Sequence, residues 1–315
     1  MPDLSVTIGR LNMRTPVLLA SGVVGYGTEY EGLVDLGAVG AIVTKTITVR
    51  PRAGNKPPRL RETHAGLLNA IGLENVGLEA FLGEKLPEAA ALKVPIVASI
   101  AGVSPAEYAT LAGRIGERPE VAAVEVNISC PNVERPRNPV WADPRATADV
   151  VAAARDATSA TLLVKLSPNA ADVLSVAEAA VEAGADALVV ANTLPAMRID
   201  LEKRAPALGN ITGGLSGPAL MPVNLALVWK VSEAVSVPII GSGGIGSPSD
   251  ALEYVLAGAS AFQVGTALFA RPEVPAEIVA GLKEQLARDG AAGLGEYVGL
   301  AHKERTTCGE MIATG

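Results

Sequence analysis

The stretch "PIIGSGGIGSPSDALEYVLAGASAFQVGTAL", Pro238 to Leu268, decides the fold because it contains one complete structural repeat. It begins and ends with short apolar runs bounded by glycines, "PIIGSGG" (Pro238 to Gly244) and "AFQVGTAL" (Ala261 to Leu268). The intervening "PSDALEYVLAGA" has the spacing of an amphipathic helix, and Gly258 suits its end. A buried strand, a helix and a second buried strand predict two parallel strands joined by a crossover helix.

The same kind of apolar run recurs along the chain, and most runs are separated by Ala-, Glu- and Leu-rich helical stretches. The six others are "PVLLASG" (16–22), "AIVTKT" (41–46), "PIVASIAG" (95–102), "AVEVNISC" (123–130), "LLVKLSP" (162–168) and "ALVVANT" (187–193). Eight such units predict one (β/α)8 barrel, with a doubly wound open sheet as the alternative. Length alone leaves the number of domains open, and we expect a single domain over residues 1–315.

Three segments lie outside this repeat. The first, "LSVTIG" followed by "RLNMRTP", precedes the first barrel strand and predicts a short N-terminal β-hairpin that plugs the bottom of the barrel. The others, Arg50 to Phe81 and Thr193 to Gly217, are too long for simple connections. Long ordered loops in such barrels usually belong to the active-site face, so we expect both there.

Composition narrows the function. A net charge of −7 and a pI of about 5.1 argue against a nucleic-acid surface. Cys130 and Cys308 form neither a metal-ligand spacing nor a disulfide framework, so we expect a reducing compartment and no metal site. The N-terminus does not resemble a signal peptide, and no apolar window is long enough to span a membrane. We therefore expect a cytoplasmic protein that takes a small substrate or binds a protein partner.

Chemistry in barrel enzymes lies at the carboxyl ends of the strands, and polar residues end these eight runs. They are Ser21, Lys45, Thr46, Ser99, Asn127, Cys130, Lys165, Asn192, Thr193, Gly243, Gly244, Gly265 and Thr266. Desolvating an unpaired ammonium costs several kcal/mol, so each lysine is expected to face an anion. A structural ion pair with a core carboxylate such as Glu125 is the alternative, but two lysines at the active face favour an anionic ligand.

The glycines after the last two strands predict a phosphate site. "GSGGIG" is weak evidence alone and also fits a tight turn, but loops after strands seven and eight are where this fold binds phosphate. Phosphate, lysines and amides together suggest flavin mononucleotide (FMN), with Lys165 stabilising negative charge on the reduced ring. Four asparagines offer a donor and an acceptor each to a second planar ring: Asn69, Asn127, Asn132 and Asn192.

Several long motifs, in order, resemble the class 1 dihydroorotate dehydrogenases. They are "GNKPPRLRETHAGLLNAIGLEN", "EVNISCPNV", "VKLSPN", "ANT", "NITGGLSGPAL", "IIGSGGI" and "VGTALF", and the likeness runs from about Pro16 to Phe269. The resemblance implies oxidation of dihydroorotate to orotate in pyrimidine biosynthesis. It implies that Cys130 removes the C5 proton while the C6 hydride passes to FMN.

The resemblance also implies residue roles. Lys45 is expected close to both flavin and substrate. The residues implied for FMN are Ala20, Ser21, Gly22, Lys45, Thr46, Ser99, Asn127, Lys165, Ala191, Gly217, Gly243, Gly244, Gly265 and Thr266. Those implied for the substrate are Lys45, Asn69, Ala70, Ile71, Gly72, Leu73, Asn127, Asn132, Asn192 and Thr193.

The electron acceptor is a separate question. "AIGLEN" and "TGGLSGPA" resemble the 1B type, which passes electrons to NAD through a partner subunit with FAD and a 2Fe-2S cluster. "ASIAG", with Ser99, is more similar to the fumarate-dependent 1A type. The dihydropyrimidine dehydrogenases, which act on uracil and thymine, also keep the cysteine. A catalytically inactive barrel that serves assembly is the non-enzyme alternative. The family implies a homodimer, or a heterotetramer with the partner subunit.

Overall fold

The computed structural model describes residues 2–128 and 139–303. Eight parallel strands close into a barrel in which each run predicted above supplies one strand. They pair in chain order: β3 (Val17–Leu19), β4 (Ala41–Val43), β7 (Ile96–Ile100), β8 (Val121–Asn127), β9 (Thr161–Lys165), β10 (Ala187–Val190), β15 (Ile239–Ser242) and β16 (Ala259–Val264). Because β16 pairs with β3, the sheet has no free edge, and the open-sheet alternative is wrong.

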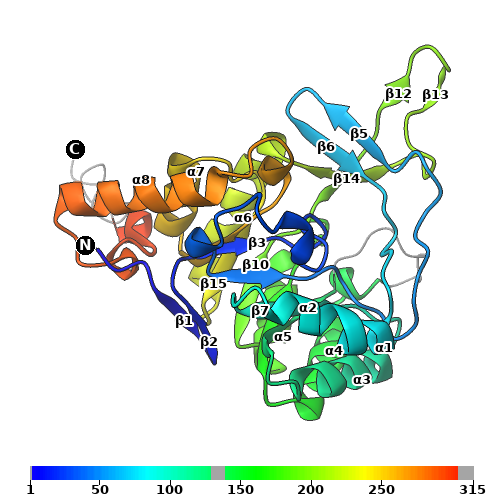
Figure 1. Ribbon diagram of the computed structural model, residues 1–315, viewed down its shortest axis with the longest axis horizontal. Coiled ribbons are helices and arrows are strands. Elements are labelled where there is room, and N and C mark those ends of the chain that lie inside the picture. Colours follow the sequence, from blue (N-terminus) through cyan, green and yellow to red (C-terminus); the bar gives the residue numbers. More distant parts are fainter. Residues whose placement is uncertain (1, 129–138, 304–315) are drawn as a thin grey trace.

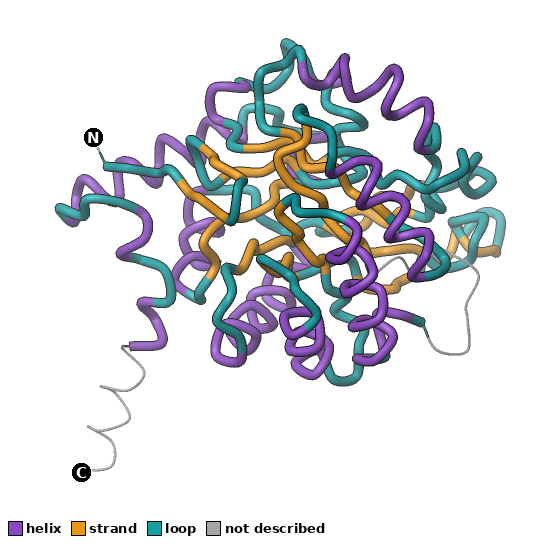
Figure 2. Tube along the Cα trace, turned by 90° about the horizontal axis from the view of Figure 1, so that it is seen from below, coloured by secondary structure: helices purple, strands orange, loops and turns teal. Residues whose placement is uncertain are grey.

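Helices surround the barrel (Figures 1 and 2). They are α1 (Leu78–Ala80) and α2 (Leu86–Ala90), joined by a π-helical turn, then α3 (Pro105–Gly116), α4 (Pro144–Ala157), α5 (Val173–Glu182), α6 (Met221–Ala234), α7 (Pro248–Leu256) and α8 (Val274–Asp289). Two short 3-10 turns, Thr28–Tyr30 and Leu36–Ala38, replace the first crossover helix. The repeat is therefore a (β/α)8 barrel whose first connection lacks an α-helix.

Local sequence explains where these helices begin and end. In α3, the Ser104 side chain accepts a hydrogen bond from the Glu107 N–H, and Pro105 follows at the first helical position. Its buried face, Tyr108, Leu111, Ala112 and Ile115, has the helical spacing that packs against the barrel. A glycine with positive φ follows the end of α7, as predicted for Gly258 (φ 114°), and another, Gly184 (φ 106°), follows the end of α5.

The N-terminal hairpin is confirmed as β1 (Val6–Ile8) paired with β2 (Leu11–Met13). Ile8, Leu11 and Met13 are buried in one cluster with inward-facing residues of the barrel, including Leu18 and Leu163. The hairpin therefore closes one end of the barrel interior with apolar side chains. A separate and larger cluster lies between the strands and the surrounding helices.

The two long connections pair with each other, which the sequence analysis did not predict. They form a four-stranded antiparallel sheet in the order β11 (Leu194–Ala196), β14 (Gly213–Ser216), β6 (Gly66–Asn69) and β5 (Leu60–Thr63). A small hairpin, β12 (Ile199–Asp200) and β13 (Ala205–Pro206), extends from it. We call these six strands the arm, which projects from the barrel at the upper right of Figure 1.

Candidate active site

A cavity of about 1030 Å³ lies where the carboxyl ends of the barrel strands meet the arm. Among the residues predicted for the cofactor, those lining it are Ala20, Ser21, Gly22, Lys45, Thr46, Asn127, Lys165, Ala191, Gly217, Gly243, Gly244, Gly265 and Thr266. Among those predicted for the substrate, Asn69, Ile71, Gly72, Leu73, Asn192 and Thr193 line it as well. The fold thus brings residues from both long connections and most strand ends around one space.

Two predicted contact residues do not line the cavity. Ala70 is buried in the arm with its neighbours Leu68 and Leu208. Ser99 is fully buried behind Thr46, and their hydroxyl oxygens lie 2.9 Å apart. Neither residue borders the cavity, and their contact with a ligand stays a prediction. Cys130 and Asn132 lie outside the described residues.

Hydroxyl and amide groups form a connected network on one wall. Ser21 Oγ donates to the Thr44 carbonyl at 2.9 Å and lies 3.2 Å from Thr46 Oγ1. The Asn127 amide donates to the same Thr46 oxygen at 3.3 Å. The Tyr108 hydroxyl of α3 donates to the Asn127 backbone carbonyl at 3.0 Å. These bonds fix polar groups in place before any ligand arrives, which is the arrangement that favours tight and specific binding.

Lys165 lies on the floor of the cavity and is connected to two further buried side chains by hydrogen bonds. Its Nζ donates to Gln263 Oε1 at 2.7 Å, and Gln263 Nε2 donates to Glu125 Oε2 at 2.6 Å. Lys165 is 6% exposed, Gln263 1% and Glu125 0%. The alternative of a direct ion pair with Glu125 is wrong, because the Gln263 amide lies between the two charges. Lys45, which is only partly buried, lines the same cavity from the segment just after β4.

The glycine loop after β15 is shaped by close packing. Gly243 (φ 128°) and Gly244 (φ 75°) have backbone conformations that other residues rarely adopt. A Cβ on Gly243 would lie 2.5 Å from the Asn224 amide nitrogen, and one on Gly244 would lie 2.6 Å from Met221 Cβ. Both positions therefore require glycine, and their backbone lines the cavity without a side chain in front of it.

Two buried side chains hold this loop in place beside the end of the neighbouring strand β10. The Asn224 amide of α6 donates to the carbonyls of Ala191, Asn192 and Ser242, at 3.2, 3.2 and 2.7 Å. The Tyr254 hydroxyl of α7 donates to the Gly243 carbonyl at 2.8 Å. Burial, reinforced by Asp250 and Glu253, raises the pKa of Tyr254, so its phenol stays a protonated donor near neutrality.

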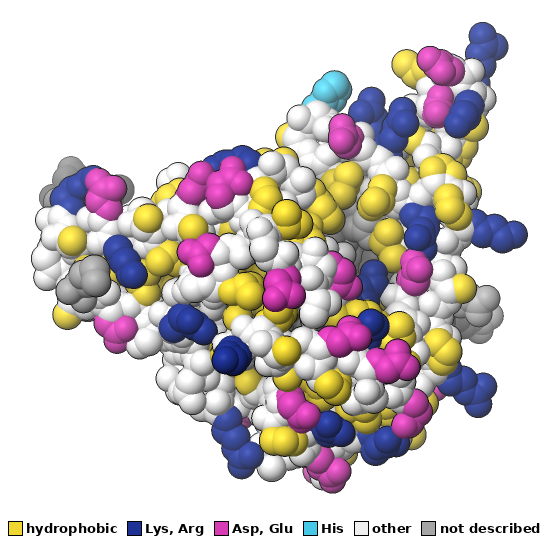
Figure 3. All heavy atoms as spheres, in the orientation of Figure 1, with side chains coloured by type: hydrophobic (Ala, Val, Ile, Leu, Met, Phe, Trp, Pro, Cys, Tyr) yellow, Lys and Arg dark blue, Asp and Glu magenta, His cyan; other side chains and the backbone are white. Residues whose placement is uncertain are grey.

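The arm supplies the opposite wall. The Asn69 amide of β6 donates to the Gly214 carbonyl of β14 at 3.3 Å, which ties the two long connections together. The Asn169 amide donates to the Thr193 carbonyl at 3.2 Å. Lys and Arg side chains gather on the arm in Figure 3, and Arg59 lies on the cavity wall itself. Two separate sheets, the barrel and the arm, therefore border the cavity.

Sequence reasoning missed several polar residues of this site. Gln263, Ser216 and Ser242 line the cavity, and Asn224 and Asn169 stand behind it. A signal existed for Gln263, since it is a polar residue within an apolar strand two positions before Gly265. Asn224 gave a weaker signal, as one amide inside an apolar helix, because an isolated asparagine does not show which way its side chain points.

Two negative findings concern residues 2–128 and 139–303 only. No group of three or more His, Cys, Asp or Glu residues within them could hold a metal ion. Within the same ranges no helix is both long and apolar enough to cross a lipid bilayer.

Comparison with known proteins links this geometry to a family. Residues 3–286 match the family model described as dihydroorotate dehydrogenase. A protein from Trichlorobacter lovleyi, named "Dihydroorotate dehydrogenase B (NAD(+)), catalytic subunit", is 53% identical over 298 residues, which cover 95% of this chain and 98% of the relative. Proteins of the same name from Geotalea daltonii and Pelobacter propionicus are 52% and 53% identical, with the same coverage.

Proposed function

Because the chain belongs to the dihydroorotate dehydrogenase family, we propose that it oxidises dihydroorotate to orotate, as the catalytic subunit of the NAD-linked type, in pyrimidine biosynthesis. The observation that carries the proposal is the cavity itself. Two lysines, several amides and a glycine loop, which lie far apart in the sequence, surround one space at the catalytic end of the barrel. Such surroundings suit a planar, anionic ligand, because the lysines can pair with its charged groups and the amides can hydrogen-bond to its polar edges.

The residues present fit FMN. Gly243 and Gly244 provide backbone that a phosphate can approach, and at Gly22, which also lines the cavity, a Cβ would project into open space. A phosphate would be held at these glycines with Gly265 and Thr266, and the ring near Lys165, Thr46 and Asn127. When bound, FMN supplies the acceptor for the hydride from C6 of the substrate.

The chain's own residues would bind and orient the substrate. Amide groups of Asn69, Asn127 and Asn192 offer paired donors and acceptors to a ring that carries both. Asn132 is proposed for the same role. Lys45 supplies a positive charge for the substrate carboxylate, which uracil and thymine lack. A cation at this position therefore favours dihydroorotate over the dihydropyrimidine alternative.

Cys130 is proposed to accept the C5 proton on Sγ. A positioned general base contributes about 10²–10⁴-fold to a rate, so Cys130→Ala is expected to slow flavin reduction by that factor while orotate still binds. Stopped-flow reduction of the flavin by dihydroorotate measures the first quantity, and orotate titration measures the second. Unchanged reduction kinetics in this variant would mean that another group is the base.

The partners follow from the relatives' names, which specify NAD(+) and a catalytic subunit. We propose that electrons leave through a partner subunit that carries FAD and a 2Fe-2S cluster, with a homodimer or heterotetramer as the assembly and the cytoplasm as its location. Residues 1–315 are proposed to form one FMN-binding domain. Co-expression with a ferredoxin-reductase-like subunit should confer NAD reduction, whereas efficient fumarate reduction by the isolated chain would favour the 1A alternative.

The central experiment needs only the purified protein. It should be yellow with bound FMN and should lose its visible absorbance on anaerobic addition of dihydroorotate. A colourless protein that cannot be reconstituted with FMN would overturn the proposal. A protein that binds FMN but is reduced by dihydrouracil and not by dihydroorotate would identify the dihydropyrimidine alternative instead.

A further inference from the structure

Beneath Lys165 lies a carboxylate that the proposed reaction does not use. Glu125 is fully buried in the barrel and does not line the cavity, whereas Gln263 and Lys165 do. We propose that Glu125 and Gln263 are positioning residues, which together fix the direction of the Lys165 ammonium toward the bound flavin. This inference rests on the proposed function, because it assigns these two residues a task in FMN binding.

The chemistry of the amide explains how a carboxylate can set this direction. Gln263 has one donor end and one acceptor end, and an ionised carboxylate can only accept. With Nε2 donating to Glu125, Oε1 is left to accept from the Lys165 ammonium. The reversed amide would set two donors against each other at Lys165 and two acceptors against each other at Glu125. The charge of Glu125 therefore selects the orientation that holds Lys165.

Strand register relates the position of Glu125 to that of Lys165. Glu125 lies opposite Leu163 on the neighbouring strand, and Asn127 lies opposite Lys165. Glu125 is thus one inward-facing step below the level of Lys165, with Gln263 reaching across from β16. Its hydrogen bond to Gln263 is its link toward the cavity, since Oε1 lacks a hydrogen-bond partner among the residues that the structure describes.

The energetic cost of burying Glu125 and Lys165 is better explained by their connection through Gln263 than by packing alone. A buried carboxylate and a buried ammonium each cost several kcal/mol when unpaired. Here opposite charges flank a single amide, and both of its bonds are charge-assisted, which makes them stronger than bonds between neutral groups. A purely structural role for this series of hydrogen bonds would not require that it end in a cation facing the cavity. A positioning role requires that cation, which is Lys165.

The test compares the unmodified chain with Glu125→Gln, which keeps the size and one acceptor oxygen but replaces the other oxygen with a donor and removes the charge. Dissociation constants of the apoprotein for oxidised FMN, and for reduced FMN in dithionite, are measured by fluorescence and absorbance titration. We expect reduced FMN to lose about tenfold in affinity relative to oxidised FMN. That ratio corresponds to a midpoint potential about 30 mV more negative for a two-electron couple.

A double-mutant cycle shows whether the effect passes through Lys165. In a Lys165→Met background, Glu125→Gln should change the affinity ratio by less than twofold. Gln263→Leu, which removes the amide between the two charges, should change the ratio as Glu125→Gln does and provides a second variant if one folds poorly. Glu120→Gln, a carboxylate on the surface just before β8 that pairs with Arg118, is the matched control and should leave the ratio unchanged.

Each outcome decides the inference. An unchanged ratio in folded Glu125→Gln and Gln263→Leu would overturn it, because neither residue would then influence the relative affinity for reduced FMN. An equal change with and without Lys165 would also overturn it, because Glu125 would then act on the fold or directly on the cofactor. Those results would leave the proposed function intact if the unmodified chain binds FMN and oxidises dihydroorotate. A chain that binds no FMN overturns the proposed function first.

Discussion

The two ends of the barrel interior are built from the same strands but from opposite kinds of residue. Toward the N-terminal hairpin the inward-facing residues are apolar, among them Ala123, Leu163 and Ala261. Two positions further along those strands come Glu125, Lys165 and Gln263, which are buried and polar. A step of two residues, about 6.6 Å along a strand, therefore separates a packed hydrophobic core from a charged cavity floor.

This contrast shows how the fold separates stability from chemistry. The apolar end is closed by the β1–β2 hairpin and needs only close packing. The polar end can hold buried charges because each finds a partner from another strand, as Lys165 does through Gln263. Substitutions at the polar end should therefore lower activity more than stability, and substitutions at the apolar end should do the reverse.

Among the residues that the structure describes, the largest effect should come from Lys45→Met at the polar end. Lys45 is proposed to pair with the substrate carboxylate, and truncating one partner of such a hydrogen-bonded charge pair costs about 2–5 kcal/mol, so we expect kcat/KM for dihydroorotate to fall by about 10³-fold. The thermal midpoint should change little, because Lys45 is only partly buried. Steady-state kinetics and calorimetry measure the two quantities. Lys230→Met, on the exposed surface of α6, is the control. A loss of kcat/KM below tenfold for Lys45→Met would contradict the expectation that polar-end substitutions act mainly on activity.

The second effect should come from Leu163→Ala at the apolar end. Leu163 is fully buried, and removing a buried leucine side chain costs about 3 kcal/mol in the free energy of unfolding. The folded fraction should keep its KM, because Leu163 does not line the cavity. Urea unfolding and kinetics below the unfolding temperature test both parts. A KM raised tenfold would show that packing at the apolar end reaches the site.

Much of the barrel could be predicted because its signal is local. Each strand is a short apolar run, and each helix between them has its own spacing and end signals, as "PSDALEYVLAGA" shows for α7. The strand-end residues were predictable for the same reason, since the carboxyl ends of parallel strands necessarily meet. The resemblance to a known family then supplied roles that position alone does not give.

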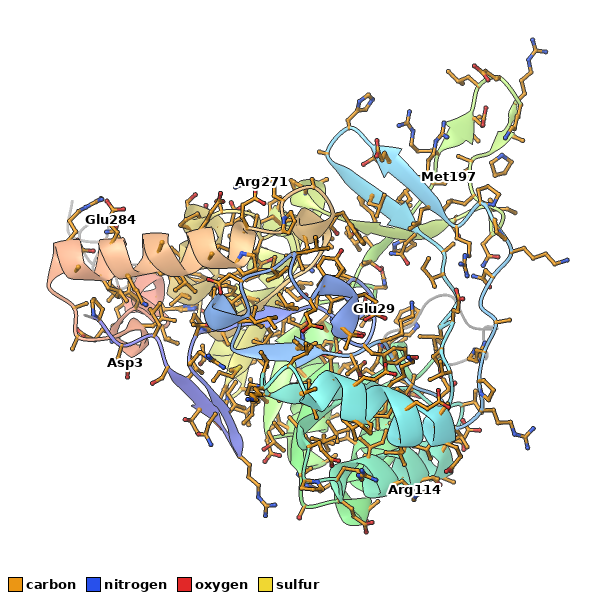
Figure 4. The ribbon with its side chains drawn as sticks, in the orientation of Figure 1. Asp3, Glu29, Arg114, Met197, Arg271 and Glu284 are labelled. Carbon is orange, nitrogen blue, oxygen red and sulfur yellow. The ribbon has the colours of Figure 1, made fainter. Side chains whose placement is uncertain are left out.

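The arm could not be predicted because its pairing is not local. β6 pairs with β14 across nearly 150 residues, and neither strand shows a strong apolar alternation. The connections between the arm's strands also carry exposed apolar side chains, such as Met197 (labelled in Figure 4) and Leu201, which look like loop residues in a sequence. The side-chain link from Glu125 to Lys165 escaped prediction for a similar reason, because it joins three strands.

A smaller effect should come from Tyr254→Phe, a substitution beside the polar end that should affect stability more than ligand binding. Loss of the hydroxyl removes one buried hydrogen bond to the Gly243 carbonyl, at about 1 kcal/mol. The raised pKa of Tyr254 adds a pH dependence with a definite sign. Above pH 10, the ordinary tyrosine pKa, the unfolded chain loses this proton while the folded chain keeps it, so stability falls by about 1.4 kcal/mol per pH unit.

Urea unfolding between about pH 8 and pH 11 measures this prediction. Below pH 10 the free energies of the native chain and of Tyr254→Phe should differ by a constant amount. Above it the native chain should lose stability more steeply, so the two curves converge. Parallel curves across the whole range would mean that the phenol ionises equally in both states. FMN affinity, measured at neutral pH, should fall only slightly, because the hydroxyl acts on the loop and not on the ligand.

The smallest effect should come from Arg114→Ala on the outer surface of α3, where Figure 4 labels this residue. Arg114 pairs with Glu79 at 3.1 Å, but their side chains are 50% and 77% exposed. Exposed pairs of this kind contribute about 0–1 kcal/mol and are screened by salt, so the free energy of unfolding should drop by less than about 0.5 kcal/mol at physiological salt. Activity should not change. A measurable loss of kcat would mean that the helical layer, and not only the barrel interior, helps to position the catalytic end.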